Sequence, residues 1–190
     1  EGIHGLNAAL GLVHDLLQQY WADLHPQLDA DDDNDPTVRI NALAGIASDS
    51  TIALLRDSML TRSRAFGPVS LRAALHASGL QHFASEPLNA DELAGALHDS
   101  DPEHLLATRE ALRSAHASAL AIEQYVSEQV GSASGVDFSA LKQPLKQALQ
   151  VLEQHLPANA TALPAANDLD VTSEVPGTAP APVAARVSGE

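Results

Sequence analysis

Apolar residues recur every three or four positions at the start of the chain, which is the period of one face of an α-helix. The run consists of Ile3, Leu6, Leu10, Val13, Leu17, Tyr20 and Leu24. It predicts a helix that ends before Pro26, because the residue that precedes a proline is disfavoured in the α region.

A second helix is predicted to start at Asp35-Pro36, since aspartate can cap free amides and proline suits the first helical position. Its apolar stripe comprises Val38, Ala42, Leu43 and Ile46. A third helix, capped by Asp49 or Ser50, would follow at once and run through Ile52, Leu55 and Met59.

Between Thr61 and Pro68 the helical period is lost, and the pair Gly67-Pro68 is typical of a turn. We expect an exposed loop here that carries arginines. A short helix from Ser70 to Ser78 is then predicted to stop at Gly79.

The longest helical pattern lies in the last third of the predicted domain. A helix capped by Asn89 and ending near Leu97 comes first, and Asp101-Pro102-Glu103 then starts a helix that keeps its period until Gly131. This long helix is rich in small side chains that let a partner helix pack closely, namely Ala111, Ala115, Ala117, Ala119 and Ala121. The predicted partner is a second apolar stripe of Phe138, Leu141, Leu145, Leu149, Leu152 and Leu156. Pro144 is expected to delay or kink that second helix.

These patterns predict an all-α fold for residues 1–156, with a multi-helix bundle of short helices and one long antiparallel helical hairpin. Residues 157–190 hold five prolines and nine alanines without a sustained period, which favours a disordered, extended linker. The first residues carry neither an initiator Met nor a basic segment typical of a signal peptide. We therefore expect that the beginning of the domain is truncated and that another domain follows the linker.

The composition excludes some classes of functional site and disfavours some binding partners. The 190 residues carry a net charge of −15 and no cysteine, so thiolate metal sites and thiol nucleophiles are excluded, and binding to bare nucleic acid is disfavoured. No run reaches the roughly 18 to 20 apolar residues that a membrane span needs, so we expect a soluble chain.

Charge is unevenly distributed along the chain. Residues 1–35 hold eight acidic side chains and no Lys or Arg, whereas residues 36–75 hold five arginines and two aspartates. Two interpretations stay open: the arginines neutralise the acidic run within the molecule, or the charges form a surface that a partner protein recognises. The candidate contact residues are Arg56, Arg62, Arg64, Asp31, Asp32 and Asp33.

One segment of about 24 positions carries a family resemblance. It runs from the aromatic pair Tyr20-Trp21 through Leu24-His25-Pro26, the acidic run and Asp35-Pro36-Thr37 to Arg39 and Asn41-Ala42-Leu43. This order resembles the ImpA-type N-terminal domain of the TssA family of the bacterial type VI secretion system. The residues that match the motif are Tyr20, Trp21, His25, Pro26, Asp35, Pro36, Arg39 and Asn41.

The motif also has a structural interpretation. Trp21 is the only tryptophan and is expected to anchor the core. Asp35 is expected both to cap a helix and to pair with Arg39 four residues later. His25 is expected to hydrogen-bond across the corner.

The resemblance implies a non-enzymatic, cytoplasmic assembly component. In this family, such a component contacts other secretion proteins (baseplate, membrane complex, tail tube or sheath) while the contractile tail is built. It also implies that the full-length protein forms a homo-oligomer through a carboxy-terminal region. Neither binding to nucleic acid nor insertion into a membrane is expected.

Catalytic and metal sites have weaker support. Asp29, Asp31, Asp33 and Asp35 resemble a calcium loop, but the glycine and the final glutamate of such a loop are missing. The alternative to an assembly protein is a metal-dependent helical hydrolase that uses His98, Asp101 and His104. These three residues match no usual zinc spacing, so we expect no catalytic residue, metal or cofactor.

Overall fold

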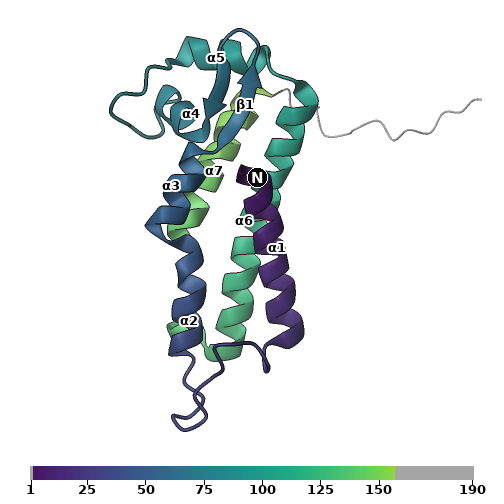
Figure 1. Cartoon of the computed structure of the whole chain (residues 1–190), viewed down its shortest axis with the longest axis vertical. Helices are drawn as coiled ribbons and strands as arrows, with labels where there is room; N and C mark the ends of the chain where they lie inside the picture. The colour runs from purple at the N-terminus through teal and green to yellow at the C-terminus, as the bar shows by residue number, and fades with distance from the viewer. Residues whose placement is uncertain (1, 157–190) are drawn as a thin grey trace, which may run out of the picture. The chain divides into compact units, whose positions relative to one another are not determined.

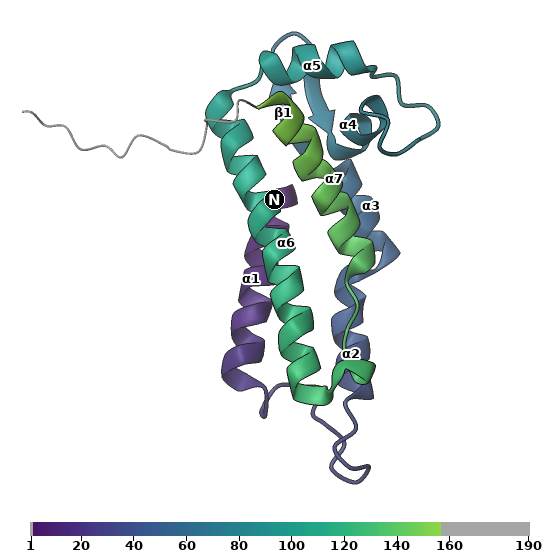
Figure 2. The ribbon, with the colours of Figure 1, turned by 180° about the vertical axis from the view of Figure 1, so that it is seen from behind.

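The computed structural model describes residues 2–156. The predicted linker, residues 157–190, lies outside the described residues. Three helices form the body of the domain: α1 (Gly2–Tyr20), α6 (Pro102–Val130) and α7 (Ser139–His155). The long helix α6 packs against α1 on one side and against α7 on the other. The chain reverses direction between α6 and α7 at the 3-10 turn η2 (Ser132–Ser134), as Figures 1 and 2 show.

A second column of helices stands beside this body. It consists of α2 (Thr37–Ala44), the 3-10 turn η1 (Gly45–Ala47) and α3 (Asp49–Asp57), which follow one another along one side (Figure 1). The helices α4 (Leu71–Ala77) and α5 (Ala90–His98) lie at the opposite end from the loop that joins α1 to α2.

The helix boundaries follow the local capping signals. The Asn89 side chain accepts from the Glu92 amide while the Glu92 side chain accepts from the Asn89 amide, which is a complete capping box. Asp101 caps α6, and Pro102 is its first residue. The cap of α3 is Ser48, one residue before the predicted Asp49 or Ser50. The first helix ends at Tyr20, six residues before Pro26.

The core is built where α6 meets its two neighbours. Its largest fully buried side chains include Leu10 of α1, Leu112 and Ile122 of α6, and Leu141 and Leu152 of α7. Of the predicted alanine stripe, Ala111, Ala115 and Ala119 are buried, whereas Ala117 faces solvent. The close packing along α6 therefore includes α1, which the sequence pattern did not single out as a partner. Pro144 lies buried inside α7 and does not delay its start at Ser139.

The all-α prediction is wrong in one place. The predicted loop from Thr61 to Pro68 is a β-hairpin, with strand β1 (Met59–Ser63) paired antiparallel to strand β2 (Gly67–Ser70). Its backbone is extended because the hairpin packs on the core: Leu60 and Thr61 are fully buried, and Val69 is 2% exposed. A run of buried residues too short for helical periodicity is compatible with a strand.

Among residues 2–156, one stretch is long and apolar enough to cross a membrane by length and composition alone, namely Thr37–Asp57. This stretch is divided between α2, η1 and α3. Arg39, which lies within it, hydrogen-bonds to carbonyls that follow α1. Only 17% of its apolar window is buried.

Candidate protein-contact surfaces

Arg39 organises the corner between α1 and α2. Its side chain is 3% exposed, and it donates from Nε to the Pro26 carbonyl at 2.7 Å and from Nη1 to the Trp21 carbonyl at 2.6 Å. Nη2 donates to the Leu24 carbonyl. These carbonyls follow the end of α1, where backbone acceptors lack helical partners. Arg39 therefore closes the loop that leaves α1, and burial lowers the pKa of its guanidinium.

Trp21 is the aromatic part of the same corner. The guanidinium of Arg39 lies 4.7 Å from the centre of the Trp21 ring, and the ring meets Tyr125 of α6 edge-on at 5.9 Å. The half-buried indole thus connects α1, α2 and α6, which is the anchoring position that the sequence predicts. Tyr20, at the end of α1, is 50% exposed.

Two contacts predicted for this motif are not formed. The Asp35 carboxylate accepts from the amide and hydroxyl of Thr37 at 3.3 and 2.9 Å, and no ion pair joins it to Arg39 among the described residues. Arg39 points to the three carbonyls because a buried guanidinium gains more from three fixed acceptors than from one solvated carboxylate. His25, exposed and joined to Pro26 by a cis peptide bond, makes no hydrogen bond within the part of the chain that the structure describes. Pro36 directly precedes α2, and Asn41 is exposed on it.

The acidic run forms a closed loop between α1 and α2. The Asp29 amide donates to the Asp35 carbonyl at 3.1 Å, and the Asp35 amide donates to the Asp32 carbonyl at 2.9 Å. Asp33 and Asn34 adopt positive φ angles of 51° and 60° to make the turn. The side chains of Asp31, Asp32 and Asp33 are exposed. The loop therefore presents several carboxylates to solvent.

The arginines do not neutralise this loop. The loop lies at one end of the described domain, whereas β1 and β2 lie at the other (Figure 1). Arg62 is exposed on β1, Arg64 is exposed in the hairpin turn, and no ion pair within residues 2–156 joins an arginine to the acidic run. The interpretation that the arginines neutralise the acidic run is wrong, because Arg39 donates to backbone carbonyls and the hairpin arginines lie at the other end of the domain.

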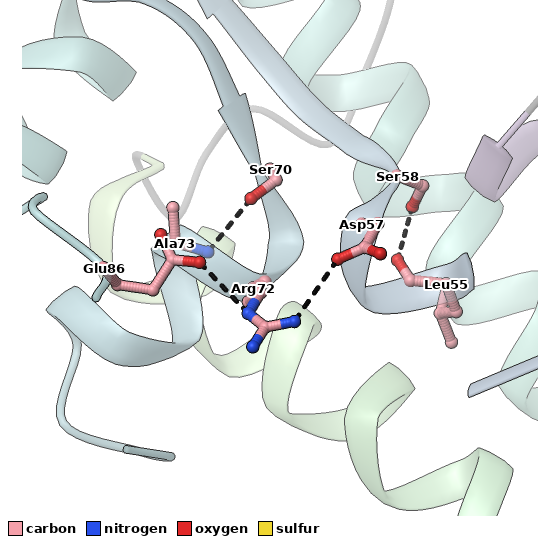
Figure 3. Close-up of polar contacts among 7 residues, drawn as sticks. All are labelled: Leu55, Asp57, Ser58, Ser70, Arg72, Ala73 and Glu86. Carbon is pink, nitrogen blue, oxygen red and sulfur yellow. Dashed lines mark hydrogen bonds and ion pairs between the residues drawn. The ribbon is translucent and has the colours of Figure 1, made fainter. Parts of the chain in front are cut away.

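Arg56 belongs with Arg72 rather than with Arg62 and Arg64. The guanidinium groups of Arg56 and Arg72 lie 5.7 and 4.8 Å from the ring centre of Phe83. Arg72 also pairs with Glu86 at 3.1 Å and with Asp57 at 3.6 Å, as the dashed lines in Figure 3 show. The arginines of the predicted contact set are thus divided between the exposed hairpin and this Phe83 cluster (Arg56, Arg72, Phe83, Asp57 and Glu86). The sequence carries no local signal for Phe83, because its partners lie on other elements.

Asp99 accepts hydrogen bonds from the hairpin turn, a role that the sequence did not indicate. Its Oδ2 accepts from the Ser63 hydroxyl at 2.7 Å, from the Arg64 amide at 2.7 Å and from the Ala65 amide at 2.9 Å. These hydrogen bonds, that from Ser63 first, lower the pKa of the Asp99 carboxyl. A carboxylate that follows α5 therefore fixes the orientation in which Arg62 and Arg64 are presented.

The predicted metal ligands are not brought together. Asp101 caps α6 by accepting from the Glu103 amide at 3.1 Å, His98 is exposed, and the ring of His104 lies 6.4 Å from that of His4. No group of three or more His, Asp or Glu side chains within residues 2–156 could hold a metal ion. The alternative hydrolase site of His98, Asp101 and His104 is therefore wrong.

Comparison with known proteins agrees with the motif. The family described as "ImpA, N-terminal, type VI secretion system" matches residues 1–48. A curated relative, the type VI secretion system component TssA1 of Pseudomonas aeruginosa, is 52% identical over 194 residues, which cover 100% of this chain and 56% of the relative. The chain thus spans about half the length of that relative.

A solved structure shows the same fold. It is the N-terminal domain, including the conserved ImpA_N region, of the TssA component of the type VI secretion system from Burkholderia cenocepacia. The TM-score is 0.62 at 19% identity, over 82% of this chain and 64% of the solved chain. The motif corner, the family match and the relative together identify an N-terminal domain of the ImpA type, as in the TssA components to which the chain is similar.

Proposed function

We propose that this chain is a docking module of a cytoplasmic type VI secretion component and acts by contact rather than by catalysis. The observation that carries the proposal is the 52% identity to a TssA1 component over the whole chain. Its partners would be baseplate, membrane-complex, tail-tube or sheath proteins. The linker of residues 157–190 would tether the domain to an oligomer, so that several weak contacts add by avidity.

Two separate charged surfaces support docking. The hairpin presents Arg62 and Arg64 at one end of the domain, and the acidic loop presents Asp31, Asp32 and Asp33 at the other. Both sets of side chains are exposed, so a partner could reach them without unfolding the domain. Separated charges of opposite sign also orient an approaching partner, because complementary potentials steer association.

The test is a binding panel with the chain of residues 1–190 immobilised against purified sheath, tail-tube, spike, baseplate and membrane-complex proteins. We expect saturable binding to one of them, weakened at least tenfold by Arg62→Glu or Arg64→Glu. Lys146→Glu, an exposed charge reversal on α7, is the matched control and should leave binding unchanged. Absence of binding across the panel, in a chain that circular dichroism shows to be folded, would contradict the proposal.

A further inference from the structure

Two apolar hollows lie between α1 and the column of α2 and α3, with volumes of about 580 and 190 Å³. We call the two hollows together the groove. The first is lined by Gly5 and Ala9 of α1 and by Leu54 of α3. The second is lined by Leu16 of α1 and by Leu43 of α2. The α1 residues of both places lie at helical spacing and so form one continuous stripe.

The walls of this groove and the helix faces beside it expose large apolar side chains. Leu54 is 72% exposed and Leu16 is 37% exposed, and Leu12 and Val38 on the adjoining faces are each 60% exposed. The stretch Thr37–Asp57 is apolar enough in composition to cross a membrane, yet only 17% of its apolar window is buried. Large exposed apolar side chains that gather along one seam are typical of a site that a partner covers.

The dimensions of the groove suit a helix. The 19 residues of α1 extend over about 28 Å at about 1.5 Å per residue. Gly2, Gly5 and Ala9 leave one end of the wall without bulky side chains, and small side chains allow two helices to approach closely. A helix of about 18 residues would therefore fill the seam from end to end.

The charges near the groove indicate which kind of helix would bind there. Residues 1–35 contain no Lys or Arg, and the single arginine of α2, Arg39, is occupied by three backbone carbonyls. The groove ends beside His25 and Pro26, a few residues from the exposed carboxylates of Asp31, Asp32 and Asp33. A second copy of the chain would bring its own acidic loop and a net charge of −15, which disfavours self-association.

We propose that the groove binds an amphipathic helix of a partner protein. The apolar side of that helix contacts α1 and the α2–α3 column, and its basic end lies at the acidic loop. This inference deepens the proposed docking function and rests on it, because it names the chemistry of the partner that the domain recognises.

The test uses the chain of residues 1–190 and two designed helical peptides of about 18 residues. Both have one leucine-rich side; one carries three lysines at one end and the other carries three glutamates there. Binding is measured by the fluorescence of Trp21, the only tryptophan, and by calorimetry. We expect the lysine peptide to bind at least tenfold more tightly, with a preference that decreases as salt is raised.

Matched variants locate the binding. Leu54→Lys and Leu16→Lys should each weaken binding of the lysine peptide at least tenfold, while Leu120→Lys, at a 45% exposed leucine of α6, should not change it. Circular dichroism checks that each variant is folded. Absence of binding, equal binding of both peptides or equal effects of all three variants would overturn the proposal.

Two further measurements address other occupants. If sedimentation shows a dimer of the unmodified chain that Leu54→Lys dissociates, a second copy fills the groove and the proposal is wrong. If phosphatidylcholine vesicles retain the chain and Leu54→Lys releases it, the groove binds lipid and the proposal is equally wrong. The peptide result is also independent of the panel, since a secretion protein can bind the hairpin while the groove binds no helix.

Discussion

The guanidinium of Arg39 lies 4.7 Å from the ring centre of Trp21 and donates to the carbonyl oxygen of the same residue at 2.6 Å, although 18 positions separate the two in the sequence. A single side chain thereby joins the end of α1 to the first turns of α2. The residues between them are closed into a loop by this contact and by its neighbours at Leu24 and Pro26, and the acidic run adds backbone hydrogen bonds of its own. The family motif therefore has a structural role, and it positions the exposed acidic loop between α1 and α2.

Replacement of Arg39 by methionine should destabilise the domain by about 3 kcal/mol, because buried carbonyl groups lose charged hydrogen-bond donors. Arg39→Lys should recover only part of this, since one ammonium group cannot reach three carbonyls in the same fork geometry. Urea unfolding followed by circular dichroism measures the effect. Arg113→Met, at a surface arginine of α6 that pairs with Glu110 and Glu153, is the control and should cost less than about 1 kcal/mol. Equal costs at the two positions would contradict this account.

Asp99→Asn should loosen the β-hairpin, and the size of this effect should depend on pH in a defined direction. The folded protein lowers the pKa of Asp99, so its carboxylate stabilises the fold fully above the ordinary carboxyl pKa, and this contribution is lost as pH falls through the lowered value. Exchange of the Arg64 and Ala65 amides, measured by NMR at neutral pH, should be faster in Asp99→Asn than in the unmodified chain.

The difference between Asp99→Asn and the unmodified chain should shrink in acid, because a protonated aspartate resembles asparagine. Asp32→Asn, in the exposed acidic loop, should leave the hairpin amides unaffected at every pH. A difference that grew as the pH fell would have the wrong sign for this mechanism.

Arg72 and Glu86 should be energetically coupled. Their ion pair of 3.1 Å includes a glutamate side chain that is only 19% exposed, next to the Phe83 ring. A double-mutant cycle with Arg72→Ala and Glu86→Ala should give a coupling of about 0.5–1 kcal/mol, reduced by salt. The more exposed pair of Arg113 and Glu110 should give about 0.3 kcal/mol. Coupling at Arg72 no larger than at Arg113 would show that burial beside Phe83 adds nothing.

Gly95 and Gly45 should respond differently to alanine. A Cβ at Gly45 meets nothing within 4 Å, whereas a Cβ at Gly95 would lie 3.1 Å from the Phe66 ring. Gly45→Ala should therefore stabilise the domain by about 0.5–1 kcal/mol, because alanine loses less backbone entropy on folding. Gly95→Ala should stabilise less or destabilise, since Phe66 must move. Thermal unfolding of both variants provides the comparison, and an equal gain would contradict it.

Local hydrogen bonding explains which parts of this fold the sequence by itself determined. The capping box of Asn89 and Glu92, the Asp101 cap and the helix ends at Gly79 and Gly131 depend on groups within a few positions of one another. Such contacts form wherever the segment is placed, so residue type and spacing are enough to predict them. The apolar periods of α1, α6 and α7 could likewise be predicted from residue type and spacing alone. The family motif could also be recognised from the order of its residues.

Only the tertiary structure decided the contacts between distant elements. Asp99 accepts a hydrogen bond from Ser63, 36 positions away in the sequence. Arg56 and Arg72 both lie beside the ring of Phe83. Arg39 donates to three backbone carbonyls and not to the nearby Asp35. Each of these contacts joins groups that only the packing of the core brings together. The buried Arg39 and Ser63 in particular require a polar partner whatever its distance along the chain. The hairpin in place of a loop, the separation of the two charged surfaces and the groove between α1 and the α2–α3 column also follow from how distant elements pack together, which residue spacing does not encode.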